Sequence, residues 1–220
     1  MKVLLIIAVI TSIALQQQPD IAFQDGFESG DTSAWTYAHN ATVVDHLSHS
    51  GKFSMAAVSD ITTATTLFKE IESSPELLLD LYLRPSSMYS PTRIAALSSP
   101  RSIPLIFIEC DDSHNLRATI RVGDSEFVYT EWLPVAKKEW NHVRVTVAHD
   151  AVVLQVERHR SSVKTATEDT SEFNMLAVGA ANSRERSSVH IDDISIGLPE
   201  TFYTYTRTVH IPLVSQRSNP

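Results

Sequence analysis

Apolar and polar residues alternate along several short segments of the chain. The alternation is clearest over residues 77–83, 116–122 and 142–148, where every second residue is apolar and its neighbours are mostly polar. Successive side chains of a β-strand point to opposite faces of a sheet. A period of two therefore predicts strands that each have one buried face and one solvated face.

Further segments show the same alternation more weakly. They are residues 42–45, 53–58, 65–69, 93–97, 105–110, 127–131, 152–157, 173–178 and 189–196. Turn-forming residues such as Asp111-Asp112-Ser113 separate them, and no apolar period of 3.6 residues persists for three turns. The longest helical candidate, residues 70–77, is interrupted by Pro75. The pattern predicts an all-β fold, a two-sheet antiparallel β-sandwich of the jelly-roll type.

The two ends of the chain differ from this middle part. Lys2, the apolar run over residues 3–13 and the small residues around Ala14 predict a signal peptide over residues 1–14. That run is shorter than the roughly 20 residues that span a bilayer, so we expect cleavage and a secreted or cell-surface protein with no membrane span in the mature chain. We expect a polar leader over 15–20, the sandwich domain over 21–197, and a linker and C-terminal tail over 198–220.

Charge and cysteine content narrow the classes of function. The net charge is −8 and no basic run occurs, which argues against nucleic acid as a partner because phosphate binding needs clustered Lys and Arg. Cys110 is the only cysteine, so the chain cannot form an internal disulfide. Cys110 ends an apolar run beside acidic residues, and we expect it to pack as an unreactive hydrophobic side chain.

Three segments resemble known secreted β-sandwich domains. The stretch Asp25-Gly26-Phe27-Glu28-Ser29-Gly30-Asp31 resembles the first strand and turn of jelly-roll carbohydrate-binding modules, and Ile191-Asp192-Asp193-Ile194-Ser195-Ile196 resembles their closing strand. Residues 140–147, with the turn and strand that follow, are similar to laminin G-like, concanavalin A-like domains. The resemblance implies a concanavalin A-like jelly roll over almost all of residues 21–197. It implies little about function, because this fold carries binding modules, adhesion domains and hydrolases.

The same resemblance implies a structural calcium ion. In several such families an early acidic residue and an aspartate of the last strand hold Ca²⁺, which corresponds here to Glu28 and Asp193, with Asp25 as a third candidate ligand. Ca²⁺ prefers six to eight oxygen ligands, including carboxylates. The alternative is that Asp25 and Glu28 belong to a turn and that Asp193 caps the end of a strand.

Hydrolytic chemistry has one weak candidate in the sequence. A retaining glycosidase needs two carboxylates about 5 Å apart, and Glu109 and Asp111 would share one side of a strand. In the pattern of retaining glycosidases with this fold, a further Glu follows two or three residues later, where this chain has Ser113 and His114. We therefore interpret these acids as a solvated turn and expect no catalytic residues, with a glycoside hydrolase as the least favoured alternative.

Exposed aromatic residues beside polar groups are the candidates for ligand binding. A sugar ring has an apolar C–H face and a rim of hydroxyl groups, which such a surface would match. The candidate ligand-binding residues are Tyr82, Tyr129, Trp132, Arg117 and Arg121. If their strands share one sheet, Tyr82, the arginines and Arg144 would lie on one wet face. We favour the alternative that these arginines form ordinary cross-strand pairs with Asp80 and Glu126, which contribute little.

The sequence therefore favours a non-catalytic module that binds carbohydrate or a surface glycoconjugate. The alternative of another class is an adhesion domain whose partner is a protein. Trp35 and Trp140 are predicted to be core residues, since large rings close the ends of such sandwiches. His46 and His49 are expected in a loop, because their spacing suits zinc binding only on a helix.

Overall fold

The computed structural model describes residues 21–89, 91–99, 104–122, 126–148, 150–165, 172–181 and 185–198. The predicted signal peptide, the leader and the tail from residue 199 onward lie outside the described residues. All regular structure in the described ranges is β-strand. Those ranges accordingly hold no helix that could cross a membrane.

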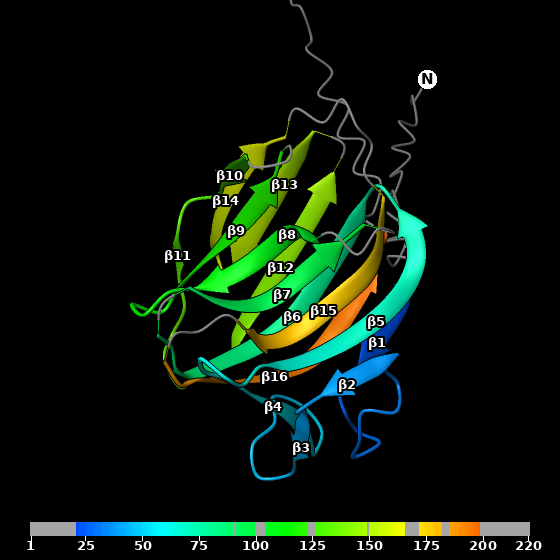
Figure 1. Cartoon of the computed structure of the whole chain (residues 1–220), viewed down its shortest axis with the longest axis vertical. Coiled ribbons are helices and arrows are strands. Elements are labelled where there is room, and N and C mark those ends of the chain that lie inside the picture. The colour runs from blue at the N-terminus through cyan, green and yellow to red at the C-terminus, as the bar shows by residue number, and fades with distance from the viewer. Residues whose placement is uncertain are drawn as a thin grey trace, which may run out of the picture.

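Two antiparallel sheets of eight strands each form the sandwich (Figure 1). Sheet A has the order β14-β13-β12-β6-β16-β4-β3, with β1 paired to β16. Its strands are β1 (Ile21–Asp25), β3 (Thr42–Val44), β4 (Ser54–Ser59), β6 (Leu77–Ser87), β12 (Asn141–Ala148), β13 (Ala151–Val156), β14 (His159–Lys164) and β16 (Ser187–Gly197).

Sheet B lies in front of sheet A in the view of Figure 1. Its order is β10-β9-β8-β7-β15-β5-β2, with β11 paired to β9. Its strands are β2 (Tyr37–His39), β5 (Thr65–Ser74), β7 (Thr92–Ser98), β8 (Pro104–Cys110), β9 (Asn115–Arg121), β10 (Phe127–Tyr129), β11 (Leu133–Pro134) and β15 (Phe173–Ala181). The predicted all-β, two-sheet sandwich is confirmed.

The core lies between the sheets and is built from the predicted alternation. On β6 the odd-numbered residues from Leu77 to Leu83 are buried, while the residues between them are half-exposed. On β12, Val143, Val145 and Val147 are buried in the same way and belong to the same cluster. Burial of each such side chain contributes about 1.5–3 kcal/mol, so the period of two supplies the main stabilisation of the fold.

The sequence prediction was incomplete for some segments. The strand predicted over residues 65–69 is longer: β5 continues to Ser74, and the Ser74 hydroxyl bonds the backbone of Glu76 at the turn into β6. The short strands β2 and β11 and the largely exposed β14 were not predicted, because a few residues or a polar sequence give no clear alternation.

The two tryptophans predicted to be core residues differ. Trp35 is buried, stacks parallel to Phe27 with ring centroids 6.4 Å apart, and confirms the prediction. Trp140 is half-exposed and packs edge-on against the His49 ring at 5.8 Å, so its assignment to the core was wrong. It precedes β12, and its ring lies against the loop that carries His49 rather than between the sheets.

Candidate functional site

The side chains of β8 and β9 show which residues of sheet B face away from the core. The even-numbered residues from 106 to 120 on these two strands belong to the core cluster between the sheets. Because side chains alternate along a strand, the odd-numbered residues point away from the core. This places Phe107, Glu109, Arg117, Thr119 and Arg121 together on the outer face, two of them being predicted ligand-binding residues.

An aromatic and arginine cluster occupies the edge of this face. The Arg117 guanidinium lies 4.4 Å from the ring centroid of Tyr129 and 4.4 Å from that of Trp132. The Tyr129 and Trp132 side chains remain 48% and 37% exposed. Arg121 lies 5.5 Å from the centroid of Phe127, which is also exposed. Four of the five predicted ligand-binding residues are thus brought to one face.

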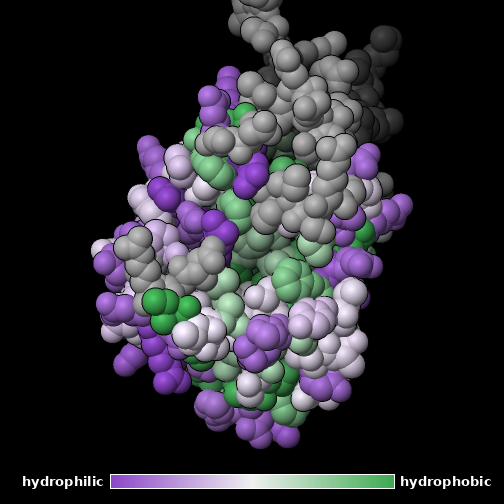
Figure 2. All heavy atoms as spheres, viewed as in Figure 1, coloured by the Kyte–Doolittle hydropathy of each residue, from purple (hydrophilic) through white to green (hydrophobic). Residues whose placement is uncertain are grey.

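A row of residues runs from this cluster across the whole of sheet B. Strand register aligns residues of seven strands on the outer face in the order Tyr37, Phe68, Ala177, Ala96, Phe107, Thr119 and Tyr129. Aromatic rings stand at both ends of the row, and two alanines form its middle. Figure 2 shows hydrophobic and weakly polar residues gathered along the middle of this side of the molecule. We call this alignment the transverse row.

Sequence analysis did not identify the end of the transverse row that Tyr37 and Phe68 form. Tyr37 is 56% exposed on β2 and lies 6.1 Å, between ring centroids, from Phe68 on β5. Phe107 is buried beneath Arg93, whose guanidinium lies 3.9 Å from its ring centroid. The run over residues 105–110 is almost entirely apolar, so no alternation indicated that Phe107 points away from the core.

Glu109 is held by protein groups on the same face. One of its carboxylate oxygens accepts a hydrogen bond of 2.8 Å from the Thr119 hydroxyl and lies 3.3 Å from Arg117 Nη2. The other lies 3.6 Å from Arg93 Nε, and Glu109 is only 8% exposed. The interpretation of Glu109 as part of a solvated turn was therefore wrong, because β8 continues through it to Cys110.

Its proposed partner Asp111 does belong to a turn. The Asp111 carboxylate accepts hydrogen bonds from the backbone and side-chain amides of Asn115, which close the turn between β8 and β9. The two acids therefore make separate structural contacts. Cys110 between them is fully buried, as predicted, and burial followed by the charge of Asp111 raises the pKa of its thiol.

Tyr82 lies on the other side of the sandwich, on β6 of sheet A. Its ring stacks between His49 and His142, with centroid separations of 3.5 Å and 4.9 Å. The idea that Tyr82 shares a wet face with Arg117 and Arg121 was wrong, because β6 and β9 belong to different sheets. A local pattern gives the exposed face of each strand but does not tell which strands share a sheet.

Beside Tyr82, a predicted cross-strand pair is present. Arg144 Nε and Nη2 donate to the two carboxylate oxygens of Asp80 at 2.9 Å and 3.0 Å. His142 Nε2 lies 2.7 Å from the same carboxylate. Burial by itself would raise the pKa of Asp80, but the hydrogen bonds from His142 and Arg144 and their charges outweigh it and lower the pKa.

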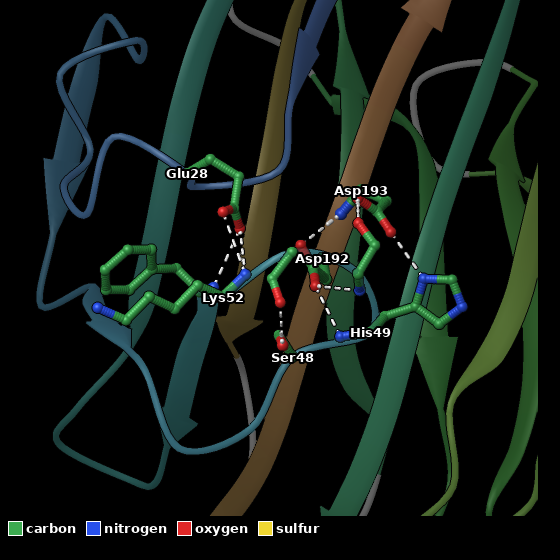
Figure 3. Close-up of polar contacts among 9 residues, drawn as sticks. Glu28, Ser48, His49, Lys52, Asp192 and Asp193 are labelled. Carbon is green, nitrogen blue, oxygen red and sulfur yellow. Dashed lines mark hydrogen bonds and ion pairs between the residues drawn. The ribbon is translucent and has the colours of Figure 1, made fainter.

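The candidate calcium ligands lie where the first turn meets the last strand. Asp25 accepts hydrogen bonds from the Phe27 amide at 2.8 Å and from Trp35 Nε1 at 2.7 Å. Glu28 accepts from the amides of Lys52 and Phe53 at 2.9 Å and 3.0 Å (Figure 3). Asp25 therefore stabilises the first turn of the domain, and Glu28 connects that turn to the segment just before β4.

The aspartate pair of β16 holds the loop before β4 (Figure 3). Asp192 is fully buried and accepts hydrogen bonds from the amides of His49 at 2.8 Å and Ser50 at 3.3 Å. Asp193 accepts from the Ser50 hydroxyl at 2.7 Å, and its other oxygen lies 2.6 Å from His49 Nδ1. Burial raises the pKa of Asp192 although the amide hydrogen bonds oppose this.

This arrangement does not form a metal centre. Within the described ranges, no group of three or more His, Cys, Asp or Glu side chains is placed to hold a metal ion. The oxygens of Asp25, Glu28 and Asp193 instead accept hydrogen bonds from different groups. Asp25, Glu28 and Asp193 line one pocket, but their hydrogen bonds are made without a calcium ion, and the calcium expectation stays a prediction.

Calcium binding is tested by thermal unfolding in chelator and in millimolar Ca²⁺. A ligand that binds only the native state raises the midpoint, by an amount set by its concentration relative to its Kd. The hydrogen-bonded arrangement predicts the same midpoint in both solutions. A midpoint raised by Ca²⁺ and insensitive to Glu28→Gln would place the ion elsewhere, whereas a rise abolished by Glu28→Gln would show that these carboxylates rearrange around it.

The comparisons with known proteins bear on the fold. No family model matches the chain, and no curated protein matches it. Among solved structures, "Cellulose induced protein, Cip1" is similar over 80% of this chain and 96% of that one, with a TM-score of 0.65 and 13% identity. The β-sandwich resemblance is confirmed by this likeness and by the sheets described above, whereas the narrower likeness to laminin G-like domains stays a prediction.

Binding domains of botulinum neurotoxin are also similar to the chain. One, "in complex with SialylT", has a TM-score of 0.55 at 10% identity and covers 75% of this chain and 44% of that one. Another, in complex with rat synaptotagmin II, has a TM-score of 0.56 at 11% identity with the same coverage. The chain thus spans less than half the length of these neurotoxin domains, and identities this low show the fold alone.

Proposed function

We propose that this chain is an exported, non-catalytic module that binds a carbohydrate chain on the outer face of sheet B. The observation that carries the proposal is the cluster of Arg117, Tyr129 and Trp132, in which two exposed rings flank a guanidinium. Aromatic faces pack against the C–H face of a sugar ring, and arginine N–H groups donate to its oxygens.

The transverse row supports a linear ligand that contacts several strands. Its seven strands are about 4.8 Å apart, so the row is about 29 Å long. Ala96 and Ala177 present only methyl groups in the middle, while Tyr37 and Tyr129 stand at the two ends. A chain of several sugar units laid across the strands would contact the rings at both ends and pass over the small residues between them.

The contacts of Glu109 favour binding over hydrolysis. A glycosidase needs one carboxyl group to protonate the leaving oxygen and a second to act as base or nucleophile. Glu109 is instead buried among Thr119, Arg117 and Arg93, and Asp111 closes a turn. Neither carboxylate is available on the outer face in the way that this chemistry requires.

The structural neighbours add indirect support. One of the similar neurotoxin domains is in complex with "SialylT", and cell entry of botulinum neurotoxin type C, another of them, depends on interaction with two ganglioside molecules. A third neurotoxin domain is in complex with a protein. Both classes of ligand occur among these neighbours, of which this chain matches less than half, and the exposed ring and arginine cluster favours carbohydrate here.

A glycan array tests the proposed function. The purified chain is expected to bind linear oligosaccharides, with affinity that rises with length until the transverse row is filled. Tyr37→Ala should reduce binding of long chains and leave short ones unchanged, because Tyr37 lies at the end remote from Trp132. Absence of binding to every glycan on the array would contradict the proposal and favour an adhesion domain with a protein partner.

A further inference from the structure

We propose, building on the function above, that the ligand of sheet B is an acidic polysaccharide whose sugars carry carboxylate or sulfate groups. Three arginines lie on the outer face of sheet B, Arg93 on β7 and Arg117 and Arg121 on β9, with β8 between these two strands. They gather here in a chain whose net charge is −8. A concentrated positive surface on an acidic protein selects for anionic ligands.

The arginines stand on both sides of the transverse row. Thr119, a member of the row, lies midway between Arg117 and Arg121 on β9. Two residues along a strand span about 7 Å, so an arginine lies about that far from the row on either side. On the Arg117 side, Arg93 pairs in register with Glu109, which pairs in turn with Arg117. Acidic groups projecting from either edge of a bound chain would therefore meet a guanidinium.

Of the three arginines, Arg121 forms no ion pair with a described carboxylate. Its Nε atom is buried without a hydrogen-bond partner. A ligand cannot contact the buried Nε, so an arriving acceptor would bond the terminal N–H groups of the guanidinium, which pair with no described carboxylate. An anionic oxygen forms the strongest hydrogen bond to the Arg121 guanidinium, because the bond is then charge-assisted on both sides.

Glu109 does not neutralise the whole group. It contacts Arg93 and Arg117, and its nearest distances to them are 3.6 Å and 3.3 Å. These separations are long for charge-assisted hydrogen bonds, which are usually about 2.7–2.9 Å, so the Arg117 guanidinium keeps capacity for a second acceptor. The Nε and Nη2 groups of Arg117 face Glu109, so a ligand oxygen would bond its other terminal N–H groups, beside the rings of Tyr129 and Trp132.

The test compares two hexasaccharides by calorimetry with the full chain. Oligogalacturonate is expected to bind at least about tenfold more tightly than cellohexaose at about 50 mM salt, and this ratio should fall as salt rises because the attraction is screened. Arg121→Gln should reduce the ratio by at least fivefold, and Arg121→Lys should restore part of it. Arg144→Gln is the matched control: it removes the same charge from the outer face of sheet A and should leave the ratio unchanged.

Each other outcome overturns the inference in a distinguishable way. Equal affinity for the two hexasaccharides would contradict the acidic preference and would still support the proposed carbohydrate function. Binding of neither would contradict both proposals. Equal affinity for an oligoglutamate peptide of the same charge would show that charge alone is recognised. An acidic preference unchanged by Arg121→Gln would place its cause elsewhere, provided that circular dichroism shows the variant folded.

Discussion

Trp132→Ala is expected to weaken oligosaccharide binding by at least tenfold, whereas Tyr82→Ala should change it less than twofold. A tenfold loss corresponds to about 1.4 kcal/mol, which is within the range for removal of a large aromatic side chain from a binding surface. Trp132 flanks Arg117 and is partly exposed, so its removal takes away a contact surface and frees the guanidinium. Calorimetric titration of both variants with the same hexasaccharide measures the difference.

Tyr82 is the appropriate control because it is also aromatic, half-exposed and located on a sheet surface. It differs in lying on sheet A, where His49 and His142 cover both faces of its ring. If Tyr82→Ala abolished binding and Trp132→Ala did not, the ligand would lie on sheet A. Equal losses in both variants would indicate that the substitutions act through folding, which their thermal midpoints would reveal.

Asp192→Ala is expected to destabilise the fold by about 3 kcal/mol and to lower the melting midpoint by about 6–12 °C. The fully buried carboxylate accepts hydrogen bonds from the amides of His49, Ser50 and Asp193, and alanine would leave these donors without an acceptor. The His49 and Ser50 amides belong to the loop before β4, so the buried carboxylate fixes this loop to β16. Chemical denaturation of the two proteins measures the change.

The neighbouring Asp193 supplies a matched control for this variant. Asp193→Asn keeps an acceptor oxygen and a side chain that tolerates the positive φ of 46° at this residue. Its contacts with Ser50 and His49 are partly exposed, so we expect a loss below about 1 kcal/mol. A larger loss in Asp193→Asn than in Asp192→Ala would show that the side-chain contacts, not the buried amide bonds, hold the loop.

The alternation of residues was sufficient to predict the sandwich. Strands with one buried and one solvated face, such as β6 and β12, follow directly from a period of two. The same rule missed strands that are too short or too polar to show an alternation, such as the three residues of β2 and the polar β14. It also gave too short a strand at residues 65–69, because pairing with β15 extends β5 to Ser74.

The candidate site was predictable only in part. Arg117, Arg121, Tyr129 and Trp132 stand out because they are charged or aromatic residues in or beside two consecutive strands, and consecutive strands usually pair. Tyr37 and Phe68 reach the same face through pairings between strands distant in the sequence. Phe107 was hidden in an apolar run. Long-range order of strands determined these positions, and no local pattern encodes it.

The most direct test of the account is a nuclear magnetic resonance titration of the isotope-labelled chain with a linear hexasaccharide. If the outer face of sheet B is the binding surface, the largest amide shifts will fall on β8, β9 and β10, around Thr119 and Tyr129. Largest shifts around Tyr82 and His142 on sheet A, with β8–β10 unchanged, would contradict the central claim.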